Sequence, residues 1–171
     1  MSRFFAAVAA LCLFAAPALA DPATLLGAFN NWSAYQTGSG SDMACYALSQ
    51  PRASQPRGAK RDPIYVMVSD YPGRKVKAEP QIIPGYEYKA GLPASLEVGS
   101  DKFVFFTRND GKTGKAWLQS LNENQHLIET MARGVSAVAF GTSARGTKTV
   151  DTYSLAGFND ALAKIHDACR M

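Results

Sequence analysis

The sequence predicts a mainly β fold, an antiparallel β-sandwich or open barrel of about eight or nine strands with two short helices, the last one C-terminal. The first observation is a series of short segments in which apolar and polar residues alternate, separated by turns rich in glycine and proline. The second is that only two segments show helical periodicity. Because helices rarely stand between consecutive strands, parallel β-α-β winding is disfavoured.

The first segment, MSRFFAAVAALCLFAAPALA (1–20), has the pattern of a secretory signal peptide. A positive Arg3 precedes an apolar run over residues 4–16, and residues 18–20 match an A-x-A cleavage site. The alternative of an uncleaved membrane anchor is disfavoured because the run is too short to span a bilayer. We expect cleavage after Ala20, a single domain over residues 21–171, and no transmembrane segment after cleavage.

The beginning of the mature chain predicts a hairpin and then a long loop. Residues 21–27 fit a short helical turn or a loose end, while FNNWSAY (29–35) and MACYALS (43–49) alternate as strands do. The glycine-rich stretch between these two segments joins them as a hairpin. Residues 50–63 form a polar loop with three prolines and four basic residues, and IYVMVS (64–69) is the next strand.

The middle of the chain predicts four more strands. EPQIIPGYEY (79–88) carries two prolines, which lack the N–H group that a central strand uses, so we expect an edge strand or a bulged strand here. ASLEV (94–98) and KFVFFT (102–107) flank a glycine turn and form a hairpin. KAWLQS (115–120) follows a second glycine turn as another strand.

Two helices and two further strands complete the predicted elements. Asn122 is the expected N-cap of a helix that ends at about Arg133. VSAVAFG (135–141) and TKTVDTYSL (147–155) are strands on either side of a small glycine-rich turn. The last helix extends from about residue 157 to about residue 168, where its apolar periodicity ends.

Two cysteines remain once the leader is removed, Cys45 and Cys169. Cys169 shares one helical stripe with four apolar residues, Phe158, Ala161, Leu162 and Ile165. Its thiol is therefore expected to face the core. In an oxidising compartment this pair favours one intramolecular disulfide between Cys45 and Cys169. Two separate buried thiols and an intermolecular bond are the alternatives, and no C-x-x-C motif indicates a redox-active pair.

Several phrases along the chain also resemble one known family. The resemblance is carried by WSAY, CYALSQP, YVMVS, GYEY, KAWL and GTSARGTKTVDTYSLAGFNDALAKIHDAC (141–169), and it covers residues 29–169. The chain resembles the invasion-associated locus B family, small exported proteins of alphaproteobacteria. This resemblance implies a periplasmic or outer-envelope protein, with a part in host-cell entry in some pathogenic members, and no catalytic residue. Many members have further cysteines near the segment corresponding to 107–116, where this chain has none.

Positive charge is concentrated in residues 52–77. Against two acidic residues, this segment holds seven basic ones: Arg52, Arg57, Lys60, Arg61, Arg74, Lys75 and Lys77. We expect them to form one basic end of the protein that attracts anionic lipopolysaccharide, phospholipid headgroups or acidic glycans. The ordinary alternative is a solvated loop whose charge only aids solubility. No nucleic acid partner is expected for an exported protein.

The candidate catalytic residues form no recognisable motif. His126 and His166 lie on the predicted helices, His166 near solvent, and with the cysteines paired too few ligands remain for a structural zinc site. Ser143 and Ser154 lack a nucleophile-elbow motif, and we interpret Asp151 as a structural carboxylate that bonds to the GTSARGT turn. Anion binding by that turn's backbone N–H groups is the alternative to an ordinary tight connection.

Trp32 and Trp117 lie in predicted strands, where core packing is the ordinary interpretation and sugar stacking the alternative. Taken together, the sequence predicts a periplasmic or outer-envelope protein without cofactor or metal. Its expected function is a non-enzymatic binding or accessory factor for an anionic envelope lipid or glycan, or for an envelope or host protein. The alternative function is a periplasmic hydrolase with an unrecognised site.

Overall fold

The strands of the protein pair into one antiparallel sheet. The structure is a computed structural model and describes residues 22–171, so the predicted leader lies outside the described residues. The strands are β1 (Thr24–Phe29), β2 (Trp32–Thr37), β3 (Ala44–Ser49), β4 (Ala53–Gln55), β5 (Tyr65–Tyr71), β6 (Val76–Ile83), β7 (Ala94–Val98), β8 (Asp101–Asn109), β9 (Gly114–Trp117), β10 (Ser136–Thr142) and β11 (Lys148–Ser154). Their order in the sheet is β1-β2-β3-β5-β6-β9-β8-β7-β10-β11-β4. The predicted mainly β, antiparallel fold class is confirmed.

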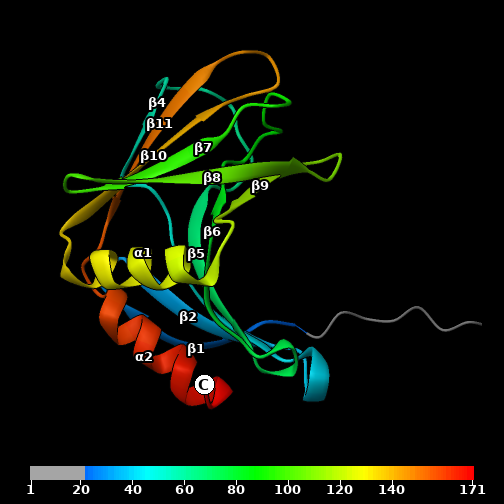
Figure 1. The fold of residues 1–171 in the computed structure, drawn as a ribbon, viewed down its shortest axis with the longest axis vertical. Coiled ribbons are helices and arrows are strands. Elements are labelled where there is room, and N and C mark those ends of the chain that lie inside the picture. The colour runs from blue at the N-terminus through cyan, green and yellow to red at the C-terminus, as the bar shows by residue number, and fades with distance from the viewer. Residues whose placement is uncertain (1–21) are drawn as a thin grey trace, which may run out of the picture.

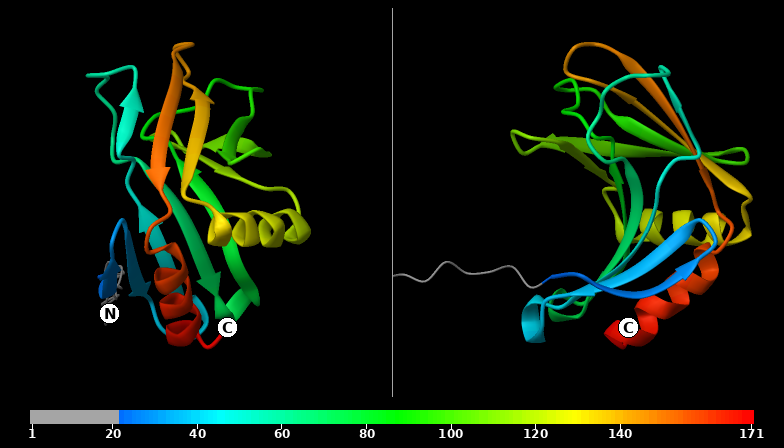
Figure 2. Two further views of the ribbon diagram at one scale, coloured as in Figure 1. Left: turned by 90° about the vertical axis from the view of Figure 1, so that its left-hand side faces the viewer. Right: turned by 180° about the vertical axis from the view of Figure 1, so that it is seen from behind.

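The sheet is strongly curved, and both helices lie on its inner side (Figure 1). Helix α2 (Phe158–Cys169) contacts β1, β2, β3 and β5, whereas α1 (Leu121–Arg133) contacts β6 and β8. Figure 2 shows the same arrangement from two further sides, with α2 against β1 and β2 and with β4, β10 and β11 at the opposite end of the molecule. The core therefore lies between the inner face of the sheet and the two helices.

The sheet has eleven strands where the sequence predicts about eight or nine, because two short elements escaped prediction. The segment 29–35 is not one strand: Asn30 adopts a positive φ of 51°, which ends β1 and begins a hairpin to β2. Residues 24–29 are therefore strand rather than a helical turn or loose end. The other addition is β4, three residues inside the predicted 50–63 loop that pair with β11.

Of the two alternatives predicted for 79–88, the edge strand is wrong, because β6 lies between β5 and β9. The bulged strand is supported, because the pairing of β6 with β5 shifts register between Ser69 and Tyr71. Pro80 is tolerated there because β9 pairs with β6 only at Gln81 and Ile82, so no strand flanks Pro80 on that side. Pro80 itself pairs only with Val68 of β5. The rest of the predicted segment, beyond Ile83, is not strand.

Helix α2 begins where the sequence predicts, whereas α1 begins before its predicted cap. Ser120, not Asn122, caps α1: its Oγ accepts from the Glu123 N–H at 3.2 Å and donates to Glu123 Oε2 at 2.9 Å. Gly157 precedes α2 with a φ of 89°, and a Cβ on it would lie 1.8 Å from the Phe29 carbonyl oxygen. Only glycine therefore lets α2 start so close to the end of β1. Neither helix in residues 22–171 is long and apolar enough to cross a bilayer.

A disulfide joins Cys45 of β3 to Cys169 at the end of α2, as the sequence predicts. Four residues of the predicted inward stripe of α2 are buried, Phe158, Ala161, Ile165 and Cys169, and the fifth, Leu162, is partly buried against the core. The bond links residues 124 positions apart and holds the last helix against the sheet.

Replacing both cysteines, Cys45→Ser and Cys169→Ser, is expected to lower the free energy of unfolding by about 5 kcal/mol at most, because the bond restricts a very long loop in the unfolded chain. Urea denaturation of the double variant and of the oxidised protein measures the difference. The oxidised protein treated with reductant is the control and should unfold at the same midpoint as the double variant. Equal midpoints for the oxidised protein and the variant would contradict the expectation.

Candidate functional site

Arg61 and Asp151 form a buried ion pair that joins the segment after β4 to β11. Arg61 Nη1 donates to Asp151 Oδ1 at 2.9 Å, and Nη2 donates to Oδ2 at 2.6 Å. The Pro84 carbonyl oxygen accepts from Arg61 Nε at 2.9 Å and from Nη2 at 2.7 Å. The two side chains are only 6% and 4% exposed. The Arg61 guanidinium therefore donates its hydrogen bonds to a buried carboxylate and to a backbone carbonyl. Because these contacts hold it inside the protein, Arg61 is not one of the exposed basic residues.

Tyrosines surround this ion pair. The Tyr86 ring lies 5.0 Å from the Arg61 guanidinium, and its hydroxyl is 2.6 Å from Thr149 Oγ1. Burial raises the pKa of the Tyr86 hydroxyl above its usual 10.0, against the opposing effects of the Thr149 hydrogen bond and the Arg61 charge. Burial also raises the pKa of Tyr88 and of Tyr153. These hydroxyls therefore stay protonated at neutral pH and do not act as general bases.

Asp151 is buried, but its partner is Arg61 rather than the GTSARGT turn, because that turn closes on itself. The N–H groups of Gly146 and Thr147 donate to the Ser143 carbonyl oxygen and Oγ, at 2.7 and 3.1 Å. The Ala144 N–H donates to the Glu87 carbonyl oxygen at 2.7 Å. With these donors used inside the protein, the turn fits the ordinary tight connection rather than an anion-binding loop.

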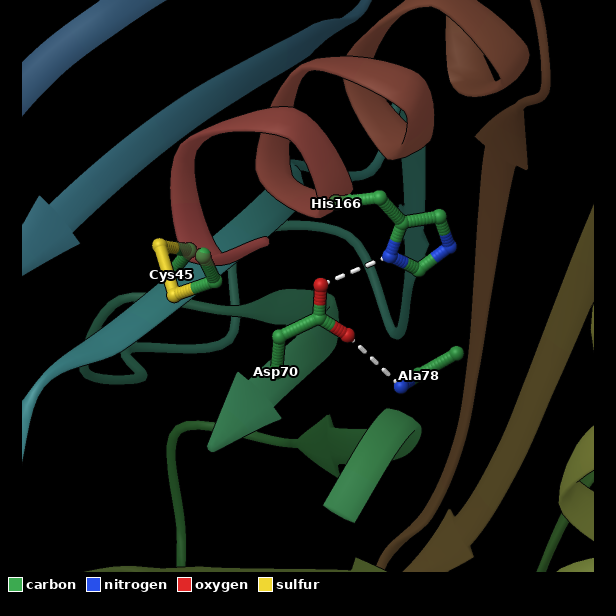
Figure 3. The surroundings of a disulfide bond; sticks show 5 residues. Cys45, Asp70, Ala78 and His166 are labelled. Carbon is green, nitrogen blue, oxygen red and sulfur yellow. Dashed lines mark hydrogen bonds and ion pairs between the residues drawn. A yellow bond between two sulfur atoms is a disulfide. The ribbon is translucent and has the colours of Figure 1, made fainter. Parts of the chain in front are cut away.

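A second polar pair lies beside the disulfide (Figure 3). Asp70 is fully buried on β5, opposite Cys45 of β3, and its Oδ2 lies 2.6 Å from His166 Nδ1 on α2. Asp70 Oδ1 accepts from the Ala78 N–H at 2.8 Å. His166 is partly exposed, in line with the prediction that it lies near solvent, but the sequence did not indicate the buried carboxylate that holds its ring. The pair ties α2 to β5 and β6 at the same place where the disulfide ties it to β3.

A hollow of about 480 Å³ opens beside His166, between α1, α2 and the start of β6. Its lining residues are Lys75, Lys77, Ala78, Leu121, Asn124, Gln125, Ile128, Glu129 and His166. This lining offers the histidine no serine, threonine or cysteine to activate. His126 lies elsewhere on α1, edge-on to Phe103 at 5.2 Å. No cluster of His, Cys, Asp or Glu within residues 22–171 has the arrangement of a metal site.

The predicted basic residues separate into two groups instead of forming one end. Arg52, Arg57 and Lys60 belong to β4 and its flanking segments, at the top of Figure 1. Arg74, Lys75 and Lys77 belong to the short helix η2 (Pro72–Arg74) and the start of β6, at the bottom of the same view. The two groups lie at opposite ends because β5 carries the chain along the length of the sheet between them.

The upper group gains two basic residues that are distant in sequence. Strands β4 and β11 are antiparallel, with Gln55 opposite Val150, so the turn after β4 and the β10–β11 turn lie at the same end of the molecule (Figures 1 and 2). We call Arg57, Lys60, Arg145 and Lys148, which these two segments carry, the cationic end. All four side chains are exposed. This grouping depends on the pairing of β4 with β11. Because β4 has only three residues, the sequence gives no strand pattern from which this pairing could be predicted.

The two tryptophans have different roles. Trp32 is buried, donates from Nε1 to the Ser154 carbonyl oxygen at 3.0 Å and packs edge-on against Phe158. It is therefore a core residue. Trp117 is half-buried on β9 and stacks with Phe106 of β8 at 5.6 Å between ring centroids.

Removing one partner of the buried ion pair is expected to destabilise the fold strongly. Asp151→Ala leaves the Arg61 charge buried and unpaired, which costs about 3–5 kcal/mol of unfolding free energy. The matched control Arg61→Met with Asp151→Leu removes both charges and should cost much less. Urea denaturation of the three proteins measures both differences, and an Asp151→Ala variant as stable as the parent protein would show that the pair is not buried as described.

Comparison with known proteins finds a likeness among solved structures. No family model matches the chain, and no curated protein matches it in sequence. Among solved structures, the crystal structure of invasion associated protein B from Bartonella henselae is similar, with a TM-score of 0.58 and 14% sequence identity. The match covers 85% of this chain and 98% of that chain. The resemblance found in the sequence is thereby confirmed for the fold: the chain has the fold of an invasion associated protein B.

Proposed function

We propose that this chain is exported by its leader, oxidised outside the cytoplasm, and acts in the periplasm or outer envelope as a non-enzymatic binding or accessory protein. Three observations support the proposal. Residues 1–20 have the signal-peptide pattern, and the disulfide is of a kind that persists in oxidising compartments. The fold is that of a protein described as invasion associated, which favours a role at the envelope or in contact with a host cell.

The observation that carries the binding function is the cationic end. Its four side chains are exposed, and none of them forms an ion pair with any residue in the described range 22–171. Their summed potential attracts anionic surfaces over a distance set by the ionic strength. The partner of this end is an anionic envelope lipid or glycan, such as lipopolysaccharide, held by contacts that salt weakens.

A hydrolase is the second candidate, favoured by the His166–Asp70 pair at the edge of a hollow. A carboxylate that holds one ring nitrogen orients the other as a base toward water or a substrate. The hollow lacks a hydroxyl or thiol nucleophile among its lining residues, which favours the non-enzymatic function. A panel of ester, amide and phosphoester substrates separates the two candidates, since hydrolysis that His166→Gln abolishes would replace the binding proposal.

Removing the cationic end is expected to weaken retention on anionic resins. In the variant Arg57→Ala, Lys60→Ala, Arg145→Ala, Lys148→Ala, the protein should elute from heparin and from immobilised lipopolysaccharide at a clearly lower salt concentration. The physical reason is the loss of four charges that act together at one end. The measurement is the sodium chloride concentration at elution.

A matched control removes four positive charges elsewhere: Lys77→Ala, Lys112→Ala, Arg133→Ala, Lys164→Ala. This control changes net charge by the same amount, so its elution should shift much less. Equal shifts for the two variants would mean that only net charge matters, and the cationic end would have no special role. Unchanged elution of the first variant would also contradict the proposal.

A further inference from the structure

The outer face of the sheet, opposite the helices, presents a row of side chains from β6, β8 and β9. The register places Phe106 opposite Trp117, and Trp117 opposite Gln81, so these three side chains project from the same face. Their neighbours Ala116 and Ile82 also pair with each other, and both are buried on the inner face. Since α1 and α2 pack on that inner face, Trp117 and Phe106 lie on the face that these two helices leave uncovered.

A shallow hollow of about 450 Å³ lies on this outer face, and we call it the Trp117 hollow. Its lining residues are Tyr71, Arg74, Glu79, Gln81, Phe106, Arg108, Lys115, Trp117 and Leu118. The Trp117 and Phe106 rings stack with only 25° between their planes, and Phe106 is 38% exposed. A flat aromatic pair that is partly exposed in this way is typical of a binding surface.

The polar side chains in the Trp117 hollow have the donor and acceptor groups that a sugar ring requires. Gln81 is buried, and its Nε2 donates to Glu79 Oε2 at 2.9 Å, so it orients the half-buried Glu79 carboxylate, whose oxygens can accept from sugar hydroxyl groups. The hollow thus combines an aromatic platform with a few placed polar groups. The C–H groups on one face of a pyranose ring pack on an aromatic face, while its equatorial hydroxyls bond to side chains at the rim.

The net positive charge of the residues that line the Trp117 hollow favours a sugar that carries negative charge. The lining holds three basic residues, Arg74, Arg108 and Lys115, and one acidic residue, Glu79. Within residues 22–171, Lys115 alone of the three has a carboxylate partner, Asp110 at 3.5 Å. Arg74 lies over the Tyr71 ring at 3.8 Å, which orients its guanidinium at one side of the hollow. Guanidinium groups bind carboxylates with two parallel hydrogen bonds. The complementary ligand is therefore a sugar chain that carries carboxylates.

From this geometry we infer that the Trp117 hollow binds an acidic glycan. One sugar ring stacks on Trp117 and Phe106, and a uronate carboxylate of the same chain bonds to Arg74 and Arg108. The shallow, open form of the hollow suits an extended chain that crosses the sheet, not an enclosed small molecule. This site is distinct from the cationic end and does not depend on it.

The test uses the mature, oxidised protein and three probes of similar length: an oligogalacturonate, a neutral oligoglucoside and polyglutamate. Tryptophan fluorescence reports the contact, because Trp32 is buried and only Trp117 is accessible to the ligand. Isothermal titration measures the affinity independently of fluorescence. The oligogalacturonate should bind and change the emission, whereas the neutral sugar and the acidic peptide should bind at least about tenfold more weakly, the factor expected for the loss of one good contact.

Two variants and two controls locate the site. Trp117→Ala and Arg108→Ala should each weaken oligogalacturonate binding at least about tenfold. Tyr46→Ala is the matched control, because Tyr46 is also a half-buried aromatic residue, stacked with Tyr35 on β2 and β3 and outside the hollow. It should change the affinity less than about twofold, as should the combined Arg145→Ala and Lys148→Ala change at the cationic end.

Three results would overturn the inference. The first is an affinity for oligogalacturonate that neither Trp117→Ala nor Arg108→Ala changes. This result would overturn the inference whatever the effect of the Arg145→Ala and Lys148→Ala change. The second is equal binding of polyglutamate with the same dependence on Trp117, which would assign the hollow to acidic peptides. The third is equal binding of the neutral sugar, which would remove the role of the carboxylate. Thermal unfolding of each variant confirms that the fold is intact.

Discussion

The fastening of the last helix to the sheet is the constraint on which the rest of this structure depends. The Cys45–Cys169 bond holds the end of α2 on β3, and the adjacent His166–Asp70 pair holds its last turns on β5. Asp70 is fully buried and also accepts the Ala78 N–H, so it positions the start of β6 as well. A covalent link and a polar pair therefore act at the same place, where the inner face of the curved sheet meets its covering helix.

The opposite end of the sheet is held by a different interaction. The Arg61–Asp151 pair joins β11 to the segment after β4, and the Pro84 carbonyl oxygen completes the coordination of the guanidinium. A buried ion pair contributes little net stability compared with apolar packing, but its geometry is specific. The pairing of β4 with β11 brings Arg57 and Lys60 to the same end as Arg145 and Lys148, and the Arg61–Asp151 pair fastens the chain after that turn to β11.

Local patterns in the sequence predicted the features that depend on neighbouring residues, namely the buried face of α2 and most of the strands. The apolar stripe of α2 placed Cys169 toward the core, and alternation located most of the strands. Two misses are local, the cap of α1 and the turn at Asn30, and the others come from long-range pairing. Pro80 lies inside the sheet because β9 pairs with only part of β6. The pairing of β4 with β11 brings together charged residues about ninety positions apart in the sequence. The entropy cost of closing a loop rises only slowly with its length, so such a separation is allowed. Similarly, nothing near Asp151 in sequence indicated that Arg61 would neutralise it.

We propose that this protein leaves the cytoplasm and that one disulfide links its last helix to the sheet. Mass spectrometry of the protein isolated from the cell that makes it, alkylated before any reduction, tests this claim most directly. We predict an N-terminus at Asp21 and a peptide in which Cys45 and Cys169 are linked. Free, alkylated thiols at these positions, or a leader still attached, would contradict the account.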